Sequence, residues 1–268
     1  MTLGKVALKS RLPGKPDSSE KDTLIVMGNG PSLRDTLSSH TPTLLAHDTM
    51  AVNFAANTDE FFTLRPRHYI LADPHFFKKD TSDPNVDKLW ENLARADWEM
   101  TLHLPVGRTA ELPANIKIAH FNMTPGEGYD FLCHALYRKG LAMPRPRNVL
   151  IPAIMEGIRT GYRNIYIVGA DHTWPHSLYV DDENRVVSVQ PHFYKDDRKE
   201  LDRVAREYAG IHIHDVLQSM VIAFRSYHDI RRYAEKMGVS VYNSTPGSLI
   251  DAFTRRSLPE QDPLTKIN

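Results

Sequence analysis

The sequence is poor in cysteine and has no surplus of charge of either sign. Cys133 is the one cysteine among 268 residues, so no disulfide can form within the chain, and its composition does not call for an oxidising compartment. The 33 basic and 33 acidic residues cancel to a formal net charge of zero. This balance lacks the positive potential that nucleic-acid-binding proteins carry. We therefore expect a small-molecule ligand, no nucleic acid, and a cytoplasmic protein.

Long apolar runs are also missing. Residues 1–22 carry several charges and two prolines, and this pattern fits neither a secretory signal nor a membrane span. We therefore expect a flexible leader there. Residues 255–268 are polar, contain Pro259 and Pro263, and are expected to form a loosely held tail. Residues 23–254 contain no evident linker. We expect them to form one domain.

Short apolar runs alternate with helix-period segments through this domain. The alternation predicts an α/β fold, a single Rossmann-like domain whose mostly parallel sheet has helices on both faces. We expect strands at 23–28, 50–53, 68–72, 100–104, 116–121, 164–169 and 239–242, and helices at 86–96, 129–139, 150–160, 199–208 and 215–237. Residues 172–197 are polar, aromatic and rich in turn signals, which favours a flexible lid over the strand ends.

A glycine-containing turn, Gly28–Ser32, follows the first expected strand. Such a turn can offer backbone N–H groups and a positive helix end to a phosphate, with Asn29 and Ser32 adding polar side chains. Leu33 stands where a dinucleotide fingerprint has its third glycine, and no Gly-Lys-Ser/Thr follows as in a P-loop. A tight turn without a ligand is the competing interpretation.

Several motifs together resemble a known family. They are Gly-Asn-Gly-Pro-Ser-Leu at 28–33, Ala-Val-Asn-Phe at 51–54, an Asp-Pro at 73–74, Gly-Tyr-Arg-Asn-Ile-Tyr-Ile-Val-Gly-Ala-Asp at 161–171, and Tyr179 eight residues later. A closing segment, Val-Tyr-Asn-Ser-Thr-Pro-Gly-Ser-Leu at 241–249, completes the set. In this order the motifs are similar to those of the bacterial sialyltransferases of glycosyltransferase family 42.

The resemblance implies inverting transfer of an acidic sugar, such as sialic acid, a related nonulosonate or Kdo, from a CMP-sugar to a cell-surface glycan acceptor. No cofactor or metal would be required. The donor-binding residues would be Gly28, Asn29, Gly30, Ser32, Asn53, Asp73, Asn148, Asp171 and Ser248, and Tyr179 would stabilise the leaving phosphate. The enzyme would work in lipopolysaccharide or capsule synthesis at the inner face of the membrane. Peripheral membrane contact and homo-oligomerisation stay open.

Two positions depart from the family pattern. Asp73 replaces an asparagine, and Asn148-Val149-Leu150 replaces the family's Thr-Ser-Gly contact with the donor sugar. Asp73-Pro74 also resembles a cousin family, the 6-hydroxymethylpterin pyrophosphokinases, in which Asp73 would hold Mg²⁺ on a triphosphate. A non-catalytic nucleotide-binding protein is the third alternative.

A histidine is the expected general base, because imidazole titrates near neutral pH. We favour His192, which lies in the lid beside Tyr194. The alternatives are His212 and His214, which alternate with Ile213 in an expected short strand.

Overall fold

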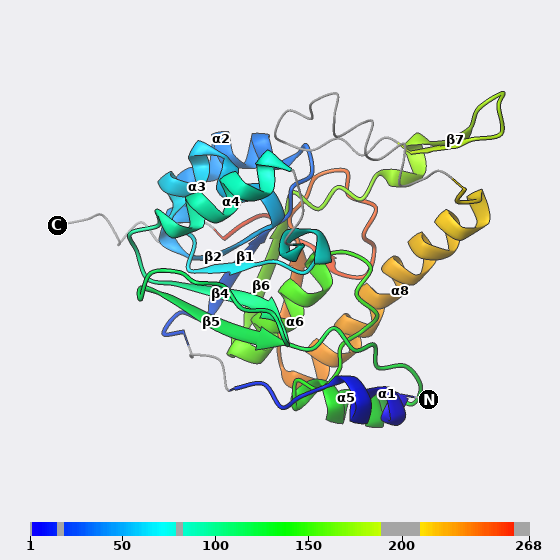
Figure 1. The fold of residues 1–268 in the computed structure, drawn as a ribbon, viewed down its shortest axis with the longest axis horizontal. Helices are drawn as coiled ribbons and strands as arrows, with labels where there is room; N and C mark the ends of the chain where they lie inside the picture. The colour runs from blue at the N-terminus through cyan, green and yellow to red at the C-terminus, as the bar shows by residue number, and fades with distance from the viewer. Residues whose placement is uncertain (1, 15–18, 79–82, 189–209, 260–268) are drawn as a thin grey trace.

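The computed structural model describes residues 2–14, 19–78, 83–188 and 210–259. At its centre is an eight-stranded sheet in which every pairing is parallel (Figure 1). This confirms the predicted fold class. From one edge to the other the strands are β10 (Thr254–Arg255), β9 (Ser240–Asn243), β6 (Asn164–Val168), β1 (Thr23–Met27), β2 (Asp48–Val52), β3 (His68–Ile70), β4 (Met100–Pro105) and β5 (Ile116–Phe121).

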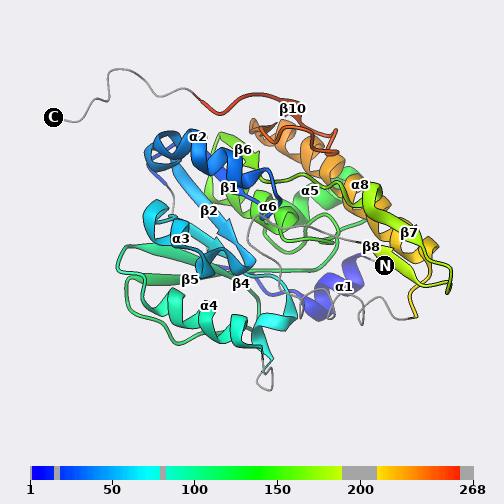
Figure 2. The ribbon, with the colours of Figure 1, turned by 90° about the horizontal axis from the view of Figure 1, so that it is seen from above.

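Helices cover both faces of the sheet, as Figures 1 and 2 show. Strand β1 alternates between two apolar cores, as a strand buried on both faces must: Leu24 and Val26 belong to one, Ile25 and Met27 to the other. The first core contains side chains from α5 (Asp130–Arg138), α6 (Leu150–Thr160) and α8 (Ile213–Met237). The second contains side chains from α2 (Leu33–Ala46), α3 (Asp59–Leu64) and α4 (Pro84–Ala94).

The strand order reverses beside β1. Strands β1 to β5 run toward one edge in sequence order, and the chain then returns through α5 and α6 to β6 on the other side of β1. In open α/β sheets, ligands bind at the carboxyl ends of the strands where the order reverses. The ends of β1 and β6 therefore mark the place to look for a site.

The N-terminal segment differs from the expected flexible leader. Helix α1 (Thr2–Lys9) buries Thr2 and Val6. After this helix, the side-chain amide of Asn122 accepts a hydrogen bond from the Arg11 N–H (3.0 Å) and donates one to the Arg11 carbonyl (2.7 Å). These contacts hold the segment against the domain. At the other end, the expected loose tail begins with a paired residue, Arg255 in β10, and a buried one, Leu258.

The described part of the expected lid, residues 172–188, contains a 3-10 turn, η3 (Trp174–Ser177), and an antiparallel hairpin of β7 (Leu178–Val180) and β8 (Val186–Ser188). Residues 189–197 of the lid and the helix predicted at 199–208 lie outside the described residues. The short strand predicted around His212 and His214 is wrong, because these residues begin α8. Asp215 and His212 form a capping box there, which favours a helix start.

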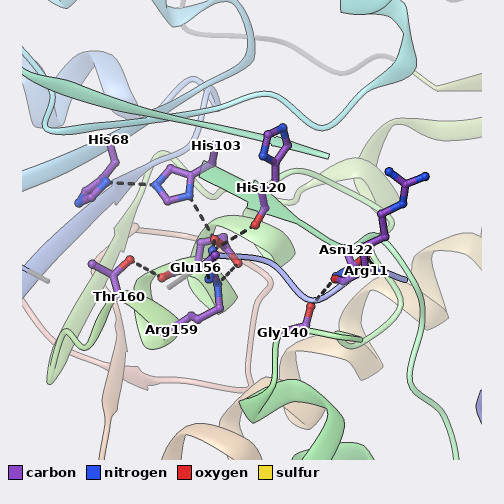
Figure 3. Close-up of polar contacts among 10 residues, drawn as sticks. Arg11, His68, His103, His120, Asn122, Gly140, Glu156, Arg159 and Thr160 are labelled. Atoms are coloured by element: carbon purple, nitrogen blue, oxygen red, sulfur yellow. Dashed lines mark hydrogen bonds and ion pairs between the residues drawn. The ribbon is translucent and has the colours of Figure 1, made fainter. Parts of the chain in front are cut away.

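A row of buried polar side chains crosses the sheet beneath α6, and Figure 3 shows its central part. Tyr162 donates to Asp48 (2.7 Å), and the ring nitrogens of His68 contact Tyr162 (2.8 Å) and His103 (3.1 Å). The second ring nitrogen of His103 contacts Glu156 (3.2 Å). The row joins β2, β3, β4, α6 and the loop before β6.

The hydrogen bonds of this row determine how many protons its side chains must carry. Its four hydrogen bonds need four protons, but the Tyr162 hydroxyl and two neutral imidazoles supply only three. Burial alone would raise the pKa of Glu156, yet hydrogen bonds from His103 and Arg159 lower it, so this carboxyl group is ionised. At the other end of the row, Asp48 accepts from Tyr162 and Ser19 and pairs with the Lys21 ammonium (3.5 Å), which favours an ionised carboxyl group, so we assign the fourth proton to the imidazole pair.

Candidate functional site

A pocket opens at the carboxyl ends of β1, β2 and β6, where the strand order reverses. Its walls come from four segments of the chain: the glycine turn, the end of β2, the start of α6 and the loop after β6. They supply Gly28, Asn29, Gly30, Pro31, Val52, Asn53, Asn148, Val149, Leu150, Gly169, Asp171, His172, Thr173 and Trp174. Six of the nine predicted donor-binding residues are among them.

Most backbone N–H groups of the glycine turn already have partners within the protein, namely those of Gly28, Gly30 and Ser32. The N–H of Gly28 donates to Val168 and that of Gly30 to Gly169, both at 2.8 Å. At the start of α2, Asp171 accepts from the Ser32 N–H (3.3 Å) and hydroxyl (2.8 Å). A carboxylate already occupies the positive end of this helix. A phosphate at the same place would face a negative charge.

Close approach to the β6 turn explains the two glycines. A Cβ at Gly28 would overlap the carbonyl of Gly169, and a Cβ at Gly30 would overlap both that carbonyl and the Asp171 carboxylate. Gly169 itself has a φ of +61°, a conformation that glycine adopts without strain. The glycines therefore bring the ends of β1 and β6 together, which forms the floor of the pocket.

Asn53 is held in an unusual conformation at the end of β2. Its φ is +51°, in the left-handed region that asparagine tolerates better than most residues. The buried hydroxyl of Tyr69 donates to the Asn53 carbonyl and accepts from the Ala56 N–H (2.8 Å). Left-handed residues other than glycine often mark functional sites, where surrounding contacts hold the strain.

Two polar residues of the opposite wall, Asn148 and His172, are joined by the buried Tyr227 behind them. The Tyr227 hydroxyl donates to Asn148 Oδ1 (2.9 Å), so it must accept from His172 Nε2 (2.7 Å). Burial lowers the pKa of His172 to about 3, which keeps its ring neutral near pH 7. The ring also stacks on Trp174, with centroids 4.1 Å apart. The His172 imidazole is thus a fixed neutral group and a weak base.

Three buried amide atoms in this pocket have no hydrogen-bond partner among the described residues: Asn29 Oδ1, Asn53 Oδ1 and Asn148 Nδ2. The orientations of the Asn29 and Asn148 side-chain amides are fixed by their other hydrogen bonds. Asn29 Nδ2 donates to Val52 O (3.2 Å), and Asn148 Oδ1 accepts from Leu150 N (3.0 Å). Buried polar groups without partners are costly. The three residues that carry these atoms all line the same pocket, which is typical of a ligand site.

The other predicted residues lie elsewhere. Ser32 stands behind Asp171, and Ser248 is buried in the turn below, where its hydroxyl donates to Ala170 O (2.6 Å). Asp73 is exposed and accepts from the His75 N–H (2.8 Å) instead of lining the pocket. Tyr179 is 54% exposed on β7 and is not in the pocket wall either. His192 lies outside the described residues.

A second pocket adjoins the first, since both are lined by Asn148 and Trp174. Arg147, Gly210, Ile211, Asp215 and residues of the first three turns of α8 complete its wall. His214, the alternative base, is exposed beside Asp215 and does not line either pocket. The sequence analysis did not identify Tyr227 as a candidate site residue. The only feature that could have indicated it is a hydroxyl group on the apolar side of a helix that packs on the core.

No group of three or more His, Cys, Asp or Glu side chains suited to holding a metal occurs within the described ranges. Helices long and apolar enough to cross a membrane are likewise not found among the described residues.

Comparison with known proteins gives one structural likeness. No protein-family model matches the chain, and no curated protein sequence matches it. The fold is similar to that of the MAf glycosyltransferase from Magnetospirillum magneticum AMB-1, at a TM-score of 0.49 and 11% sequence identity. The alignment covers 96% of this chain and 37% of that one, so the chain spans under half the length of its neighbour. A likeness at this level says nothing about substrates.

Proposed function

We propose that this protein is a glycosyltransferase that binds a nucleotide-activated sugar in the pocket at the ends of β1, β2 and β6. The donor we propose is a CMP-linked acidic sugar, as the motif resemblance implies. The observation that carries the proposal is the set of three unpartnered amide atoms, Asn29 Oδ1, Asn53 Oδ1 and Asn148 Nδ2, in a pocket where the strand order reverses.

The types of these atoms indicate how such a donor would bind. Asn29 Oδ1 is an acceptor, and an ionised phosphate, which has only acceptors, cannot satisfy it. Ribose hydroxyls or the amino group of a cytosine can. Asn148 Nδ2 is a donor two residues before α6, so a phosphate there would meet both an N–H group and a positive helix end. We therefore propose that the phosphate lies near Asn148, across the pocket from the glycine turn.

The adjoining pocket supports an acceptor site. It opens beside Asn148, where the proposed phosphate lies, and it carries the exposed guanidinium of Arg147 and the indole of Trp174. Aromatic faces and charged groups suit a glycan with acidic substituents. In this proposal His192 removes the proton of the acceptor hydroxyl, and Tyr179 reaches the leaving phosphate when a donor is bound. Both roles come from the motif resemblance.

The decisive experiment measures ligand-dependent stability and turnover together. Thermal unfolding of the purified chain is followed with CMP, UDP, ADP and ATP, each with and without Mg²⁺. CMP should raise the unfolding temperature without metal, because a ligand that binds only the folded state stabilises it. Stabilisation by ATP only with Mg²⁺ would favour the pyrophosphokinase alternative. CMP binding without sugar transfer from any CMP-sugar offered would favour a non-catalytic binding protein.

One variant tests the pocket itself. Asn148→Asp keeps the acceptor oxygen that Leu150 and Tyr227 use, but it replaces the unpartnered donor with an anionic oxygen. Affinity for CMP should fall at least about tenfold, since a charge-assisted hydrogen bond becomes a repulsion. Asn85→Asp, at the exposed start of α4, is the matched control and should not change binding. If Asn148→Asp binds CMP with unchanged affinity, the phosphate does not bind beside Asn148.

A further inference from the structure

The segment 2–14 contacts residues just before and just after α5, and it turns an apolar face outward. Thr2 contacts the main chain of Glu127, which precedes α5, through two hydrogen bonds (2.5 and 3.2 Å). Pro13 packs on Gly140, just beyond the end of α5. Figure 1 shows α1 at the end of the molecule away from α2, and Figure 2 also separates α1 from α2. The segment is thus tied to the domain along its length.

Helical geometry fixes which residues of α1 face outward. Successive residues turn by about 100°, so with Thr2 and Val6 buried against the domain, the opposite side carries Leu3, Gly4, Ala7 and Leu8. All four are exposed, Leu3 at 57% and Leu8 at 86%. A globular domain normally turns polar residues outward from a surface helix. Here the outer side of the helix is apolar.

Further apolar side chains extend this surface. Leu12 is 76% exposed, and Tyr129 and Phe131, at the start of α5, are 77% and 70% exposed with their rings stacked at 6.0 Å. Tyr129 is two residues from Glu127, to which Thr2 is bonded. We call Leu3, Leu8, Leu12, Tyr129 and Phe131 the α1–α5 surface.

The charged groups around this surface are mainly basic and unpaired. Within the described residues no ion pair involves the basic side chains of the segment 2–14 or of the end of α5, which are Lys5, Lys9, Arg11, Arg138 and Lys139. Figure 3 shows the Arg11 side chain directed away from Asn122 and Gly140, the residues that hold this stretch. The nearby acids are already neutralised, Glu127 by Arg145 (2.6 Å) and Asp130 by Arg232 (3.1 Å).

We propose that the α1–α5 surface docks on an anionic lipid membrane, with its leucines and aromatic rings in the interface and its basic side chains on the lipid headgroups. Exposed leucines together with lysines on one flank of a helix are the pattern of interfacial helices. Tyrosine and phenylalanine suit the headgroup boundary, and each basic residue near an anionic surface strengthens binding about fivefold. A second copy fits this surface poorly, because a twofold interface would bring the same five basic side chains together. The proposal does not depend on the proposed transferase activity.

Vesicle co-sedimentation of the full chain tests the proposal. The chain should bind vesicles that contain about one-third phosphatidylglycerol but not phosphatidylcholine alone, and raised salt should weaken the binding. Leu8→Glu should lower the partition coefficient by at least about tenfold. Lys5→Gln combined with Lys9→Gln should lower it about 25-fold. Leu45→Glu makes the same change on α2, at a leucine that is 51% exposed, and should have no effect.

Circular dichroism of each variant shows whether it is folded, and size-exclusion chromatography gives its oligomeric state. Failure to bind anionic vesicles, equal binding to neutral ones, or an equal loss in Leu45→Glu would overturn the proposal. So would a dimeric parent chain that becomes monomeric with Leu8→Glu, since the surface would then be covered by a second copy.

Discussion

Acid should destabilise the folded protein through His172, and the structure sets the size of the effect. Burial lowers the pKa of this imidazole from 6.5 to about 3. Between these two values the unfolded chain binds a proton that the folded chain excludes. The contribution of His172 to stability is therefore fully present above pH 6.5 and decreases as the pH falls toward about 3. At about 1.4 kcal/mol per pH unit, about 2 kcal/mol is lost by about pH 5.

The assay is urea unfolding at about pH 7 and pH 5 for the parent chain and for His172→Asn. Asparagine does not titrate in this range and tolerates the φ of +52° found here. The variant should be less stable at neutral pH, because Tyr227 and Trp174 lose contacts with the imidazole. Its loss of stability on acidification should, however, be smaller than that of the parent by about 2 kcal/mol. His176→Asn, at an exposed neighbour, should keep the parental pH dependence. Equal pH dependence in the parent and His172→Asn would refute the reasoning, whatever the other titrating groups contribute.

Three other predictions follow from the fold and the proposed reaction. Gly30→Ala should lower the free energy of unfolding by about 1–3 kcal/mol in urea titrations, because its Cβ would overlap Asp171. Gly4→Ala is the control and should not destabilise the protein, because the space around Gly4 is open. Equal effects of the two substitutions would contradict the close approach at Gly30. Ring-nitrogen NMR near pH 7 should show one imidazole of the His68–His103 pair with protons on both nitrogens, and two neutral rings would contradict the proton count. If the proposed transfer occurs, His192→Ala should lower turnover about 10²- to 10⁴-fold with little change in CMP affinity. Tyr179→Phe should slow transfer, because the phosphate of the departing CMP loses a stabilising hydrogen bond. If His192→Ala keeps its activity and His214→Ala loses it, the general base is His214. If both variants keep their activity, neither histidine is the general base.

Much of the architecture could be predicted because its signal is local. Runs such as Leu24–Met27 are apolar on both sides of the strand, and that pattern indicates a buried parallel strand without any knowledge of its neighbours. The predicted bounds of α6 and β5 agree with the structure. The short strand expected at 212–214 failed, because two residues of alternation cannot outweigh a capping box at the start of a 25-residue helix.

The sequence by itself determined the alternation of strands and helices and the positions of the polar side chains at the ends of β1, β2 and β6. Only the tertiary structure decided what those side chains do. Asp171 follows Ser32 by 139 residues, yet it occupies the helix end that a local motif offers to a phosphate. Tyr227 and Asn148 are 79 residues apart, and their hydrogen bond fixes which amide atom is left for a ligand. Hydrogen-bond partners are set by proximity in space, and a donor that is free in a motif can already be bonded to a distant segment in the fold.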